Sequence, residues 1–194
     1  MIATRINVLV LAGLASLAGL SAGCGDLVRQ GTGSYTLVID SLEASAGASG
    51  EVGTTLQSDV FTGGGVISDS GSVTLRLIAK NPFGPSPSDL NSVVISRYRV
   101  TFRRSDGRNT PGEDVPFPFD SALTIRVPAG GSASAGFEFV RHNAKREAPL
   151  AGLRTSLVKI STIADISFFG RDMAGNDVAA TGSIGVTFGD FADP

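Results

Sequence analysis

The chain has 194 residues, of which 42% are hydrophobic and 18% are charged, a length that suits one folded domain together with a targeting segment. A net charge of −2 argues against the basic surface of a nucleic-acid-binding protein. Because the chain contains one Cys and one His, it cannot form an intramolecular disulfide, a Cys-based zinc cluster or a multi-histidine metal centre.

The first 23 residues combine a positive charge at Arg5 with an apolar stretch that ends in small residues. Residues 8–23 carry no charge, and this stretch is shorter than the roughly 20 residues that a helix needs to span a bilayer. The pattern predicts a secretory signal peptide over residues 1–23, which is removed and does not take part in the fold.

The end of this segment resembles the lipobox of bacterial lipoproteins, in the residues Leu20-Ser21-Ala22-Gly23-Cys24. The resemblance implies cleavage just before Cys24, a diacylglycerol on its sulfur and usually an acyl group on its new amine. It departs from the family at Ser21, where the lipobox usually has leucine. Gly25 in the next position implies the outer membrane, with the protein facing the periplasm or the cell surface. An ordinary signal peptide followed by an incidental cysteine is the alternative.

Residues 24–33 are expected to be a lipidated cysteine and a flexible tether, and residues 34–194 a single domain. The tether is polar, contains glycine and has no hydrophobic period. Its nine residues after Cys24 reach at most about 30 Å when extended.

From Ser34 onward the dominant hydrophobic period is two residues, which is typical of half-buried antiparallel strands. The alternating segments are 35–40, 73–80, 94–103, 123–127, 133–139, 166–168 and 184–188. Turns rich in Gly, Pro, Asn and Asp separate them. The best helix candidate, 143–157, is interrupted by Pro149. Residues 45–65 are rich in Gly and Ser and predict a long loop within the domain.

The last predicted hairpin contains Asp172-Met173-Ala174-Gly175-Asn176, a D-x-x-G-N motif. It resembles a hairpin that is common near the end of bacterial immunoglobulin-like and fibronectin-like domains. Gly175 tolerates positive φ, and the Asp172 side chain can accept hydrogen bonds from turn N–H groups. The strand pattern and this resemblance together predict an all-β fold, a single immunoglobulin-like antiparallel β-sandwich of about 7–9 strands.

An acidic loop over residues 106–114 is a candidate calcium site, because hard oxygen ligands on a glycine-containing loop suit Ca²⁺. The candidate ligands are Asp106, Asn109, Glu113 and Asp114. The spacing is not that of an EF-hand, and Arg108 opposes a dense anionic cage. Asp, Gly and Asn also serve ordinary turns, which is the alternative.

A strand over 94–103 places arginines on one face, with Val94, Tyr98, Val100 and Phe102 on the other. The candidate binding residues are Arg97, Arg99 and Arg103, which Arg76 and Lys80 on a neighbouring strand would extend into a basic ladder. Such a face can bind phosphate head groups, anionic glycans or an acidic partner. The alternative is a solvated strand face whose arginines pair with acids across strands.

Two further features have structural explanations. His142 could act as a general base only with a nucleophilic serine and a carboxylate nearby. The chain has no Gly-x-Ser-x-Gly motif that would supply such a serine, so we predict no catalytic residue. In the Pro-rich stretch 115–119, Phe117 and Phe119 are expected to be buried, on an edge strand or a polyproline segment.

The sequence therefore predicts a non-enzymatic, lipid-anchored interaction or structural module of the cell envelope. Its expected partners are a membrane, through the lipid on Cys24, and an envelope protein or glycan, without a nucleic acid. No cofactor is expected apart from the covalent lipid. The alternative is a ligand- or ion-binding module that takes Ca²⁺ at the 106–114 loop or an anion on the arginine face. A sandwich fold does not choose between these roles.

Overall fold

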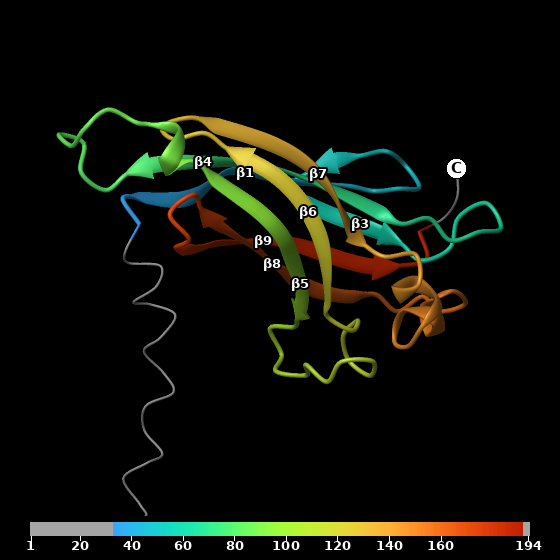
Figure 1. Ribbon diagram of the computed structural model, residues 1–194. Coiled ribbons are helices and arrows are strands. Elements are labelled where there is room, and N and C mark those ends of the chain that lie inside the picture. The colour runs from blue at the N-terminus through green and yellow to red at the C-terminus, as the bar shows by residue number, and fades with distance from the viewer. Residues whose placement is uncertain (1–32, 192–194) are drawn as a thin grey trace, which may run out of the picture.

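The computed structural model describes residues 33–191, which form strands, turns and three short 3-10 helices (Figure 1). The elements are β1 (Tyr35–Ser45), β2 (Val52–Gly53), β3 (Thr55–Asp59), β4 (Asp69–Ala79), η1 (Asp89–Asn91), β5 (Val93–Arg103), β6 (Phe119–Val127), β7 (Ser132–Val140), η2 (Ala144–Arg146), η3 (Leu150–Leu153), β8 (Ile160–Asp172) and β9 (Asp177–Gly189). The predicted signal segment, Cys24 and most of the tether lie outside the described residues.

The strands form two sheets, one with the order β2-β1-β4-β7 and one with the order β3-β9-β8-β5-β6. Neighbouring strands are antiparallel, except that β3 runs parallel to β9. The chain changes sheet repeatedly instead of completing one sheet before it starts the other. The prediction of an all-β sandwich is confirmed, with one parallel pair added.

A single hydrophobic core fills the space between the two sheets. At its centre Phe137 of the four-stranded sheet meets Tyr98 and Phe168 of the five-stranded sheet, with ring centroids 5.1 Å and 5.5 Å away. Burial raises the pKa of Tyr98, whose hydroxyl donates a 2.9 Å hydrogen bond to the carbonyl oxygen of Glu138 in β7. Large aromatic side chains from both inner faces therefore hold the sheets together.

A bulge in β5 overturns the prediction for Val94. The pairing of β5 with β6 and β8 shifts between Ile95 and Arg97, so the alternation of faces restarts there. Val93 and Ile95 consequently point into the core, whereas Val94 is half-buried. The inward positions of Tyr98, Val100 and Phe102 are confirmed. Gly170 of β8 lies opposite the bulge, where a Cβ would overlap the carbonyl oxygen of Val94.

The prediction of a long loop over 45–65 was wrong, because this segment contains β2 and β3. Strand β3 extends the five-stranded sheet alongside β9, and Leu56, Ser58 and Asp59 are buried. The local composition is poor for a strand, but the edge of β9 offers unpaired backbone groups along its length. Tertiary pairing therefore overrides local propensity here.

Of two proline-containing segments, one agrees with the prediction and one differs from it in part. Residues 143–157 form the short helices η2 and η3 on either side of Pro149. Phe119 is buried at the start of β6, which is an edge strand as the prolines require, but Phe117 is 47% exposed. Phe117 lies over Gly112, where a Cβ would overlap its ring, so it covers the 106–114 loop and does not enter the core.

The predicted turn chemistry of the last hairpin is confirmed. Strands β8 and β9 pair along their whole length, and Gly175 has a φ of +89° in the turn between them. The carboxylate of Asp172 accepts hydrogen bonds from the backbone N–H of Ala174 (3.0 Å) and of Asn176 (2.8 Å). The Asp172 carboxylate thus serves as acceptor for turn N–H groups in place of a backbone carbonyl.

Each end of the sandwich has its own set of loops. The N-terminal end, where the described chain begins at Gly33, contains the loops 80–92, 128–131 and 173–176 (Figure 1). Backbone hydrogen bonds join this end, from Lys80 to Ser34 (3.0 Å) and from Met173 to Ser92 (3.2 Å). The distal end contains the loops 46–51, 60–68, 104–118 and 141–159.

Candidate functional site

The outer face of the five-stranded sheet holds the predicted arginines of β5. Arg97, Arg99 and Arg103 all point outward and are about half exposed. The register places Asp120 of β6 opposite Arg99, and Asp165 of β8 opposite Thr101. These are the cross-strand positions at which opposite charges meet most easily.

Each of the three arginines has an aspartate partner on a neighbouring strand. Arg97 and Arg99 both reach Asp120, with N–O distances of 2.8 Å and 3.4 Å. Arg103 contacts Asp165 at 2.7 Å. Burial alone would raise the pKa of Asp165, but hydrogen bonds from Arg103 and Ser183, together with the Arg103 charge, lower it instead. The face is therefore a ladder of paired charges with an excess of one arginine over the two aspartates.

The prediction that Arg76 and Lys80 extend this ladder was wrong for a topological reason. Strand β4 pairs with β1 and β7 in the other sheet, so Arg76 lies on the opposite outer face of the sandwich. There its guanidinium contacts Asp40 of β1 at 2.8 Å. Alternation along a strand shows which way a side chain points, but it does not show which strands become neighbours.

A groove of about 600 Å³ opens on the arginine-bearing face, beside the bulge in β5. The guanidinium of Arg97 lies over the ring of Phe169 from β8, 3.9 Å from its centroid. Across the groove, Arg171 donates a 2.5 Å hydrogen bond to Asp177 of β9. The guanidinium groups of Arg97 and Arg171 beside this groove have the donor geometry that suits an anionic group such as a carboxylate or phosphate.

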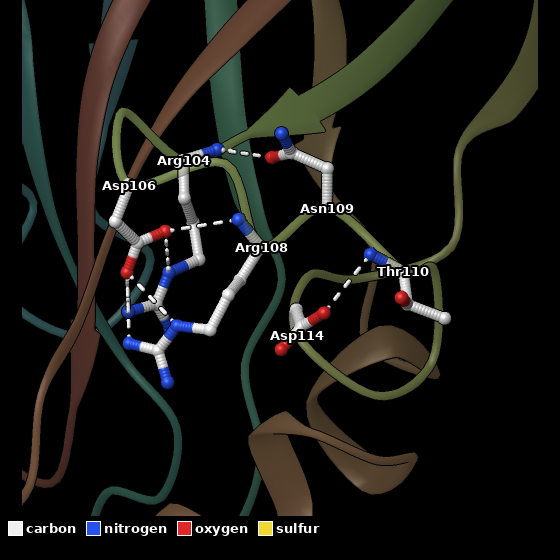
Figure 2. A network of polar contacts seen from close by, with 6 residues as sticks. All are labelled: Arg104, Asp106, Arg108, Asn109, Thr110 and Asp114. Carbon is white, nitrogen blue, oxygen red and sulfur yellow. Dashed lines mark hydrogen bonds and ion pairs between the residues drawn. The ribbon is translucent and has the colours of Figure 1, made fainter.

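In the 106–114 loop, by contrast, the side chains of Asp106, Asn109 and Asp114 accept hydrogen bonds from nearby arginine and backbone groups. Asp106 accepts hydrogen bonds from Arg104 at 2.7 Å and from Arg108 at 2.8 Å (Figure 2). Hydrogen bonds from these two guanidinium groups hold the pKa of Asp106 far below its usual range. Figure 2 also shows Asn109 accepting from the backbone N–H of Arg104 (2.6 Å), and Asp114 from that of Thr110 (3.1 Å).

This arrangement gives the predicted calcium site no support. Within residues 33–191, no group of three or more acidic, histidine or cysteine side chains is placed to hold a metal ion. The oxygens of Asp106, Asn109 and Asp114 accept hydrogen bonds from arginine or backbone groups of the loop itself. The alternative in which these residues serve turns accounts for the contacts, and Gly107 and Gly112 have φ values of +83° and +80°.

A buried ion pair near the distal end was missed by the sequence analysis. The side chains of Lys145 (η2) and Asp69 (β4) are completely buried, with a 3.0 Å N–O distance between them. Asp69 also accepts hydrogen bonds from the hydroxyl of Ser58 (2.6 Å) and the backbone N–H of Gly47 (2.9 Å). The group joins four segments that are distant in sequence, so no local pattern reveals it.

The buried Ser58 hydroxyl and the ring of His142 both have polar partners within the described residues. Ser58 is completely buried, and its hydroxyl donates to the carboxylate of Asp69, so a substrate has no access to it. His142 contacts the side chain of the adjacent Asn143 at 3.4 Å.

Within the described residues 33–191, no helix is long and apolar enough to cross a bilayer.

Comparisons with known proteins add little to this geometry. No protein-family model and no curated protein matches the chain. Among solved structures, the chain is similar to the X-ray structure of Northeast Structural Genomics Consortium target SoR45, with 9% identity and a TM-score of 0.37. The similarity covers 78% of this chain and 84% of that one. The function therefore has to be argued from the residues themselves.

Proposed function

We propose that this protein is a non-enzymatic module of the cell envelope, held at a membrane by a lipid on Cys24. In this role it presents an immunoglobulin-like sandwich to a protein or glycan partner, on the outer membrane and facing the periplasm or the cell surface. The observation that carries the proposal is the position of the single cysteine of the chain, directly after the small residues that end the apolar segment 8–23. A bacterial lipoprotein needs a thiol at this place.

The geometry of the described chain agrees with this role. The sandwich begins at Gly33, nine residues after Cys24, and all of β1 to β9 follow. A tether of at most about 30 Å would therefore hold the domain by its N-terminal end. Stable attachment needs two or more acyl chains, which is the modification that the lipobox resemblance implies.

The anchor is tested by changing Cys24. We expect the Cys24→Ser variant to lose all incorporation of a labelled fatty acid and to leave the membrane fraction, because the acylated sulfur is absent. The measurement is metabolic labelling with an alkyne fatty acid, followed by fractionation and mass spectrometry of the N-terminal peptide. The Gln30→Ser variant, which keeps the thiol, should be labelled like the unchanged protein. A bare sulfur on unchanged protein found wholly in the soluble fraction would refute the proposal.

A second candidate role is binding of an anionic ligand on the arginine-bearing face. The observation that favours it is the groove in which Arg97 lies over Phe169, with Arg171 nearby. A phosphate, sulfate or uronate group could contact these guanidinium groups without displacing the cross-strand aspartates.

We expect an anionic polysaccharide such as heparin to raise the melting temperature of the unchanged protein, because a ligand that binds only the folded form stabilises it. The triple variant Arg97→Ser/Arg99→Ser/Arg103→Ser should lose the increase. The Arg76→Ser variant is the matched control, since Arg76 is paired in the same way on the opposite face. An equal increase in the triple variant would exclude Arg97, Arg99 and Arg103 as binding residues.

A further inference from the structure

The N-terminal end of the sandwich displays large apolar side chains. Phe83 and Leu90 in the loop 80–92 are 95% and 71% exposed, and Met173 in the turn 173–176 is 54% exposed. Large apolar side chains that are exposed together on one end of a domain are typical of a surface that contacts a partner or a membrane. Their loops are held together, since Met173 is hydrogen-bonded to Ser92, and a Cβ on Gly130 would lie 3.3 Å from the Pro87 ring.

The three loops at this end carry little charge of their own, although the strand ends beside them hold Asp172, Arg126, which pairs with Asp89, and the ion pair Arg171–Asp177. Lys80 and Asp89 are the charged residues of its three loops, and they bound an uncharged stretch over residues 81–88. Three of those eight residues are proline, which has no N–H group that would need a partner in an apolar environment.

The distal end differs in this respect. Its exposed apolar residues include Leu157, which is fully exposed, but the neighbouring loop 104–118 alone contains five charged residues. They are Arg104, Asp106, Arg108, Glu113 and Asp114. Moving such a surface into lipid would cost the hydration of many charges, whereas the loops of the N-terminal end would lose the hydration of few, provided that the strand ends behind them stay in water.

We propose that the N-terminal end of the sandwich docks on the surface of the lipid bilayer, with Phe83 and Leu90 entering the interface between head groups and acyl chains. This inference rests on the proposed lipid anchor at Cys24. The anchor raises the local concentration of this end at the membrane, so even a weak apolar contact becomes effective. The two signals together hold the domain upright, with its sheets and distal end directed away from the bilayer.

The reach of the chain explains why only one end can dock in this way. Gly33 is the ninth residue after Cys24, which allows at most about 30 Å between the lipid and the N-terminal end. Strand β8 has 13 residues and runs between the two ends, so these ends lie about 40 Å apart. Leu157 at the distal end is therefore out of reach of the bilayer when the domain stands upright, although it is more exposed than Phe83.

The absence of tryptophan from the chain makes this proposal directly testable, because one introduced tryptophan becomes a unique fluorescent reporter. We would reconstitute the lipidated mature protein in phosphatidylethanolamine–phosphatidylglycerol vesicles, with and without brominated acyl chains, which quench tryptophan on contact. The reporters are Phe83→Trp and, independently, Leu90→Trp. The Leu157→Trp variant is the matched control, an exposed apolar position at the opposite end.

We expect brominated lipid to reduce the fluorescence of Phe83→Trp and Leu90→Trp about twofold or more, with a blue-shifted emission, because tryptophan settles at the membrane interface. Leu157→Trp should keep the emission maximum of a tryptophan exposed to water.

Flotation of the vesicles measures the anchor separately. Protein that does not float refutes the anchor and the docking together. Protein that floats without quenching at position 83 or 90, or with equal quenching at 157, keeps the anchor and overturns the docking.

Discussion

Replacing Lys145 with methionine is expected to lower the free energy of unfolding by about 3–5 kcal/mol, because it leaves the carboxylate of Asp69 buried without a counter-ion. Both side chains are inaccessible to solvent, with their charged atoms 3.0 Å apart. Asp69 would keep only the hydroxyl of Ser58 and the N–H of Gly47 as partners. Urea unfolding followed by circular dichroism measures the change as a lower midpoint.

The matched control is Arg76→Met, which breaks an exposed ion pair with Asp40. Exposed pairs contribute about 0–1 kcal/mol, so this variant should unfold close to the midpoint of the unchanged protein. In the double variant Asp69→Asn/Lys145→Met no charge remains buried at this place, and the amide can still accept the N–H of Gly47. It should recover about 1–3 kcal/mol relative to Lys145→Met. A double variant that is less stable than Lys145→Met would show that the unpaired charge is not the cause of the loss.

The second large effect is expected at Phe168, where replacement with alanine should destabilise the protein by about 3–5 kcal/mol. Phe168 is completely buried, and its ring packs against Phe137 and Tyr98 at the centre of the core. The truncation leaves a cavity between the two sheets that neither backbone can close, because hydrogen-bonded neighbours hold each strand in place. The measurement is again the urea midpoint, with circular dichroism of the folded variant to confirm that the sheets persist.

The adjacent residue provides a control with the same chemistry. Phe169 follows Phe168 in β8 but points to the outer face, where its ring contacts the guanidinium of Arg97. Phe169→Ala should cost about 1 kcal/mol, since it loses a contact with a cation at an exposed site. If the two variants lost equal stability, the assignment of inner and outer faces in β8 would be wrong. The Phe169→Ala variant should also weaken any anion binding in the groove while the domain stays folded.

Several elements of the fold follow from the sequence alone. The alternation over 73–80 and 94–103 predicts strands because a period of two puts one face of each strand in the core, whatever its neighbours are. The motif from Asp172 to Asn176 predicts a hairpin turn, and the structure places Asp172 as the hydrogen-bond acceptor of that turn. The outward direction of Arg97, Arg99 and Arg103 follows from the same alternation.

The candidate site was only partly predictable. The arginines of β5 were found as a set, but their aspartate partners come from β6 and β8, and Arg76 belongs to the other sheet. The groove depends on the bulge between Ile95 and Arg97, which no turn or proline in the sequence marks. Phe169 directly follows the predicted strand segment 166–168, and its contact with Arg97 exists only because β5 and β8 pair in this register.

Local features follow from the sequence alone: strands, turns and the direction of alternate side chains each depend on residues a few positions apart. The relationships between distant segments, in contrast, depend on the tertiary structure. The strand at Thr55–Asp59 exists because β9 offers it an edge, and Lys145 is buried because Asp69, 76 residues earlier, is there to pair with it. The physical reason is that a buried charge or a short strand is stable only with its partner present, and the partner is chosen by the packing of the whole domain.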